Sequence, residues 1–238
     1  MNMVLINTVD KDVQSLLFPF NLILYITFCT KYRIVKNVIT PIGPVFNCIS
    51  MTAKVIGITS FIYYTYNVSL RIQYQHITSI YFGTYFDVIF YCSGLAMNFV
   101  TGIMRTKNNI QLVLNFQKIH RVLNHEIYLK LFVINNWVIV FIATSSNLII
   151  STYFLTRLGF PYYYVFADCL LAVYDFNVVY ATRVIKLLKN KVILWSNKIL
   201  NYPDTNDENY RKNVFLAYAD ILKCYNNHKY CFQHFVSI

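Results

Sequence analysis

Residues 131–156 read LFVINNWVIVFIATSSNLIISTYFLT and contain no Lys, Arg, Asp or Glu. As a helix that rises about 1.5 Å per residue, this segment is about 39 Å long. The hydrocarbon core of a bilayer is about 30 Å thick, so the segment is long enough to cross it. This uncharged stretch therefore predicts a membrane-spanning helix.

Three further apolar stretches carry only isolated charges. Residues 37–70 contain only Lys54, residues 72–104 contain only Asp87, and residues 158–182 contain only Asp168 and Asp175. In the whole chain of 238 residues, 57% are hydrophobic and 13% are charged, about half the charged share of globular domains. We predict an all-α, multipass transmembrane bundle with four spans at residues 45–70, 79–104, 131–155 and 160–185.

The segments on either side of these spans are shorter or more polar. Residues 13–30 form another uncharged run, but it is short and is interrupted by Pro19 and Asn21. We expect an interfacial or re-entrant helix there, with a true crossing as the alternative. The predicted organisation is an N-terminal segment (1–44), the four-span bundle (45–185), and a helical extension ending in the start of a fifth, truncated span (186–238).

The basic residues predict the orientation of the chain. The Lys and Arg counts before, between and after the four spans run four, one, five, one and at least five. Because the loops rich in Lys and Arg face the cytoplasm, we expect a cytoplasmic N-terminus in the plasma membrane. The net charge of +11 lies at the edges of apolar runs, which favours the lipid bilayer over nucleic acid as a partner. The single sequon begins at Asn67, outside but close to the membrane, which disfavours its glycosylation.

Three segments resemble lepidopteran insect gustatory receptors: DVQSLLFPFNLILYITFCTKYRI (12–34), ITPIGP (39–44) and YADILKCYNNHKYCFQ (218–233). The resemblance implies a ligand-gated cation channel that detects a small-molecule tastant. It also implies a homo- or hetero-tetramer whose seventh helix lines the pore. The family's signature in that helix, a Thr-Tyr plus Gln-Phe pattern, is absent here. The chain matches the family through four of seven spans, so we expect a product truncated before the pore helix that conducts no current alone.

Polar side chains in the outer halves of three predicted spans suggest a binding pocket. Carboxylates there can accept ligand hydroxyls or pair with a cationic nitrogen, and tyrosine rings can stack on a ligand. The alternative is that these groups form interhelical hydrogen bonds. The family resemblance places its ligand pocket in this region. The candidate ligand-binding residues are Tyr81, Tyr85, Asp87, Asn147, Ser151, Tyr164 and Asp168.

Other chemistry-bearing residues support weaker hypotheses. Lys54 is expected to extend towards the cytoplasmic interface. His120 and His125 suggest a histidine-box lipid-modifying enzyme, but such enzymes need several boxes; a transporter fragment is a further alternative. We expect no enzymatic activity, cofactor or metal. One more set of residues could suggest a zinc site: Cys224, His228, Cys231 and His234. On a helix the first and last of these lie about 15 Å apart, which favours ordinary packing over a shared metal ion.

Overall fold

The structure, a computed structural model, describes residues 7–73, 78–123, 126–157, 169–170, 172–200 and 208–236. This part of the chain is mostly helical, so the predicted all-α class is confirmed at that level. Its seven helices are α1 (Lys11–Ile26), α2 (Pro44–Gln73), α3 (Thr78–Met104), α4 (Thr106–Val122), α5 (Glu126–Arg157), α7 (Val173–Leu200) and α8 (Glu208–Val236).

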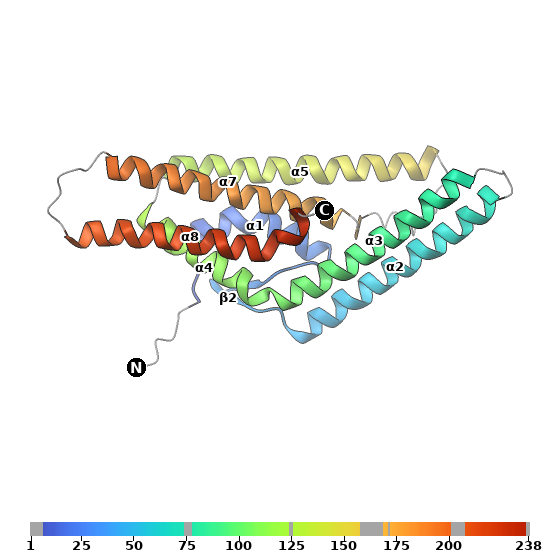
Figure 1. The fold of residues 1–238 in the computed structure, drawn as a ribbon, viewed down its shortest axis with the longest axis horizontal. Helices are drawn as coiled ribbons and strands as arrows, with labels where there is room; N and C mark the ends of the chain where they lie inside the picture. The colour runs from blue at the N-terminus through green and yellow to red at the C-terminus, as the bar shows by residue number, and fades with distance from the viewer. Residues whose placement is uncertain are drawn as a thin grey trace.

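The helices divide into a bundle and a set of projecting helices (Figure 1). Helices α1, α4, α7 and α8 gather at one end, and we call this group the basal bundle. Helix α5 runs along the long axis of the molecule and packs against α1 in its first half. Helices α2 and α3 pair and project away from the basal bundle, and the last turns of α2 and the first turns of α3 lie towards the same end as the C-terminal end of α5. We call that end of the molecule distal.

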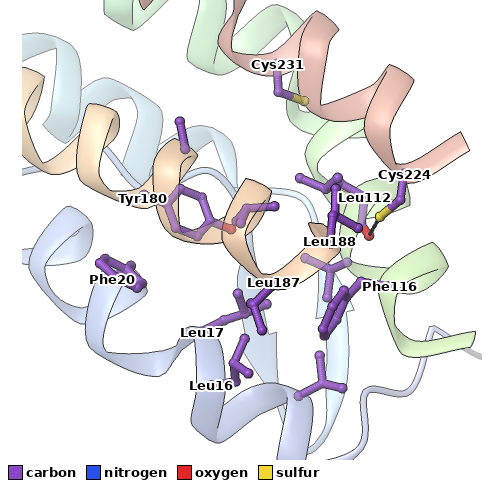
Figure 2. Packing of buried hydrophobic residues seen from close by; sticks show 14 of the residues in the cluster. Leu16, Leu17, Phe20, Leu112, Phe116, Tyr180, Leu187, Leu188, Cys224 and Cys231 are labelled. Carbon is purple, nitrogen blue, oxygen red and sulfur yellow. Dashed lines mark hydrogen bonds between the residues drawn. The ribbon is translucent and has the colours of Figure 1, made fainter. Parts of the chain in front are cut away.

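The basal bundle has a continuous apolar core. Leu16, Leu17 and Phe20 of α1 face Tyr180 and Leu187 of α7 in Figure 2, with α4 and α8 closing the other side. All five of these side chains are less than 5% exposed. Helix α1 therefore contributes one face to a protein core. Its opposite face leaves Phe18, Leu22, Tyr25 and Ile26 exposed.

Within the described residues, two helices are long and apolar enough to cross a membrane, within Pro44–Asn67 of α2 and Tyr128–Tyr153 of α5. They coincide with the first and third predicted spans. Helix α3 covers the second predicted span, and its Val88–Met104 part passes the same test together with α4, across a bend of 62°. Of the fourth predicted span, residues 160–168 and 171 lie outside the described part, and α7 begins at Val173.

A small antiparallel hairpin departs from the all-α expectation. Strands β1 (Arg33–Val35) and β2 (Val38–Thr40) pair directly across Lys36 and Asn37, both of which have positive φ. That backbone geometry is typical of a two-residue hairpin turn. The backbone amide of Ile39 also donates to the Asn7 carbonyl, so the hairpin is held by the segment before α1.

Candidate functional site

The predicted ligand pocket is only partly covered by the described residues. Tyr164 and Asp168 lie outside them. Tyr81, Tyr85 and Asp87 lie in the distal half of α3, but their side chains are likewise outside the description. Asn147 and Ser151 are described, one turn apart on the distal half of α5. The pocket as a whole thus stays a prediction.

In the distal half of α5, three polar side chains are turned inward, while Ser146 and Thr152 are exposed. Thr144 and Asn147 are half-buried and Ser151 is 2% exposed, whereas Ile142 and Ile149 are 58% and 69% exposed. The Thr144 hydroxyl and the Asn147 amide donate to carbonyls one turn back in the same helix, at 2.8 and 3.0 Å. This arrangement is the reverse of a water-soluble helix, which turns its apolar side inward.

A buried polar contact joins three helices where α5 enters the basal bundle. The Asn136 amide donates to the Leu16 carbonyl of α1 at 2.9 Å, and its oxygen accepts from Arg183 Nε of α7 at 2.8 Å. The Arg183 guanidinium lies over the Phe132 ring at 3.9 Å. Asn136 is 1% exposed and Arg183 is 7% exposed. We call this contact the Asn136–Arg183 junction; the sequence analysis did not single out either residue.

A second buried cation lies beside it, between α1 and the end of α8. Lys31 Nζ lies 3.9 Å from the Phe232 ring centre and 5.1 Å from that of Tyr180. The hydroxyls of Tyr32 and Tyr180 are 3.3 Å apart. Burial lowers the pKa of the Lys31 ammonium to about 7. Through these cation–π contacts of Lys31, the loop after α1 is attached to both α7 and α8.

The structure corrects the prediction for Lys54. Its side chain is 5% exposed and does not extend to an interface. The ammonium donates to Ser50 Oγ at 2.9 Å and to the Phe28 carbonyl at 3.2 Å, and it lies over the Phe99 ring. The reason is that the loop following α1 packs against α2 and offers a carbonyl acceptor within reach. Lys54 thereby connects the loop after α1 with α2 and α3.

The histidines and cysteines of the basal bundle take part in packing. His120 Nδ1 lies 3.2 Å from Lys191 Nζ, a cation that would compete with a metal ion, and His125 lies outside the described residues. Burial lowers the pKa of Lys191 to about 8. Cys224 donates to the Leu112 carbonyl, as Figure 2 shows, and His228 Nε2 lies 3.0 Å from the Ala181 carbonyl.

Two glycines allow Leu170 and the first turn of α7 to approach the projecting helices. A Cβ at Gly57 of α2 would overlap the Leu170 side chain, and one at Gly94 of α3 would overlap the Tyr174 hydroxyl. Small residues permit such close helix contacts in membrane bundles. Asn67, the sequon asparagine, lies within α2, whereas glycosylated asparagines occupy surface loops.

Together these contacts form a connected path. The projecting helices meet Leu170 and the first turn of α7 at Gly57 and Gly94, and α5 meets α1 and α7 through the Asn136–Arg183 junction. No protein-family model, curated protein or solved structure matches the chain.

Proposed function

We propose that this chain is a gustatory-type chemoreceptor subunit, part of a ligand-gated cation channel that detects small-molecule tastants. The observation that carries the proposal is the reversed polarity of distal α5. Thr144, Asn147 and Ser151 face inward while Ile142 and Ile149 face outward. In a bilayer this arrangement leaves apolar side chains towards lipid and polar ones towards a shared interior, where a small polar ligand can be bound.

In the proposed topology, the basal bundle lies in the cytoplasm and the distal ends of α2, α3 and α5 face outside. Exposed basic residues on the basal bundle and the start of α5 support this orientation through the positive-inside rule. They are Lys107, Lys118, Arg121, Lys130, Lys186 and Lys189.

The proposed mechanism couples the outer ligand to the cytoplasmic bundle. A ligand held between α3, α5 and the segment before α7 draws these helices together. Because α5 is hydrogen-bonded to α1 and α7 at Asn136, its movement changes the packing of the basal bundle. The resemblance implies that the pore is lined by the family's seventh helix. The change in packing of the basal bundle would be transmitted to that helix.

Ligand-dependent stabilisation tests the proposal. The purified chain in detergent is heated with sugars, alkaloids and amino acids, one class at a time. A ligand at 100 times its Kd should add about 2.7 kcal/mol of stability. Asp87→Asn and Asp168→Asn should weaken binding about ten- to hundredfold, because a charged hydrogen bond is worth about 1.5–3 kcal/mol.

Asp220→Asn, the same exchange in the basal bundle, is the matched control and should bind as the original chain does. The proposal is refuted if no class stabilises the folded chain. Unchanged affinity in both amide variants would remove the two carboxylates from the site.

A further inference from the structure

A groove of about 660 Å³ lies between α1, the β1–β2 hairpin and the first turns of α2. Its volume falls in the range of small-ligand sites. Three side chains from the outward face of α1 line it, Phe18, Leu22 and Tyr25, spaced to share one side of the helix. None of the outer-pocket candidates contributes to it.

The α2 side of the groove is also apolar. Val45 and Ile49 are 72% and 49% exposed, and the rings of Phe46 and Tyr25 stack at 5.2 Å. Apolar side chains from two helices thus face a shared open space. Such exposed apolar surface marks a binding surface for a protein or a lipid.

One edge of the groove is polar. Among the described residues that line it, Arg33 is the only charged one, and it is exposed on β1. Thr30 also lines the groove, but its hydroxyl is shielded from solvent. A cation beside an apolar trough is the combination that would bind an anionic phospholipid.

We propose that this groove binds one anionic phospholipid of the leaflet next to the basal bundle. An acyl chain lies against Phe18, Leu22 and Ile49, and the phosphate accepts hydrogen bonds from Arg33. The inference rests on the membrane embedding in the proposed function and is independent of tastant binding.

The position of the groove selects a lipid over a peptide. The candidate span of α2 begins at Pro44, directly beside Val45 and Ile49, so the groove opens at the depth where a bilayer's headgroups meet its chains. Basic pockets at this depth bind anionic headgroups. The positive edge and the apolar trough match the two ends of a phospholipid.

Tryptophan quenching by brominated lipids tests the proposal. The Trp137 ring lies 5.9 Å from Phe18, while the other tryptophan, Trp195, is stacked on Tyr218 between α7 and α8. The full chain with Trp195→Phe is placed in nanodiscs containing brominated phosphatidylserine or phosphatidylcholine. Phosphatidylserine should quench Trp137 at about fivefold lower mole fraction than phosphatidylcholine, because one basic residue contributes about 1 kcal/mol to the binding of an anionic lipid.

Arg33→Gln should abolish this preference, and Lys36→Gln, in the hairpin turn but outside the groove lining, should retain it. Equal quenching by both lipids, or a preference that survives Arg33→Gln, overturns the proposal. A second copy of the chain in the groove would show as equal quenching with a doubled particle mass. No quenching by either lipid would refute the membrane embedding itself, whereas failure to bind tastants leaves this result unaffected.

Discussion

Replacing Asn136 with leucine should destabilise the chain strongly, because this amide holds three helices together. Asn136→Leu keeps a similar volume but removes the acceptor for Arg183 and the donor for the Leu16 carbonyl. Loss of a hydrogen bond to a charged group costs about 1.5–3 kcal/mol, and loss of a second hydrogen bond to the Leu16 carbonyl, which already has its partner within α1, costs about 0.5–1.5 kcal/mol. We therefore expect the free energy of unfolding to fall by about 2–4.5 kcal/mol.

Unfolding of the purified chain in mild detergent, followed by circular dichroism, measures this loss. Asn147→Leu is the matched control on the same helix, since the Asn147 amide donates only to the Ala143 carbonyl one turn away among the bonds described. It should cost less than about 1 kcal/mol, the scale of a single polar contact in a membrane bundle.

A double-mutant cycle separates the pair from other effects. Arg183→Met combined with Asn136→Leu should cost about 1–3 kcal/mol less than the sum of the single changes, because each single change leaves the other group buried without its partner. Additive losses, or an Asn136→Leu variant as stable as the Asn147→Leu control, would refute the reasoning.

Three further changes test the rest of the structure. Arg121 lowers the pKa of the Asp10 carboxyl through a bidentate contact, so Asp10→Asn should lose less than about 1 kcal/mol at neutral pH. This stabilisation is present above the unfolded pKa of 3.8 and disappears as the pH falls through the lower folded value. The unfolding curves of the original chain and of Asp10→Asn should therefore coincide in acid. Burial lowers the pKa of Lys191 to about 8. Between about pH 8 and the unfolded pKa of 10.5 the unfolded state binds more protons than the folded state, so the free energy of unfolding should rise with pH over this interval. Lys191→Met should flatten this rise. Gly94→Ala should be about 1–3 kcal/mol less stable than Gly102→Ala by thermal unfolding, because a Cβ at Gly102 meets no atom within 4 Å.

The helices that could be predicted from the sequence are those whose signal is local. Loss of charge over 131–155 predicts the apolar part of α5, and the helix extends beyond it at both ends, from Glu126 to Arg157. The charge pattern shows where a helix is apolar. Backbone hydrogen bonding does not depend on that pattern, so the helix also includes charged residues such as Lys130. The hairpin also has a local signal, Lys36-Asn37 between the β-branched runs Ile34-Val35 and Val38-Ile39-Thr40, which the all-α interpretation did not use.

The contacts between helices could not be predicted, because they depend on which face meets which neighbour. Asn136 and Asn147 look alike in the uncharged run, yet one joins three helices and the other bonds its own. Helix α1 is apolar enough for an interface, but one of its faces is covered by α5 and α7. Periodicity identifies an apolar face and does not distinguish lipid from protein as its neighbour.

Labelling at the two ends of α5 tests the central claim, that this helix crosses the membrane with the basal bundle inside. Lys130→Cys and Arg157→Cys lie about 40 Å apart on one helix, and both positions are exposed. Each is made in a chain whose exposed Cys48 and Cys169 are replaced by serine. A membrane-impermeant maleimide should label position 157 on intact cells and position 130 only after permeabilisation. Labelling of both positions from the same side, or of position 130 alone on intact cells, would contradict the account.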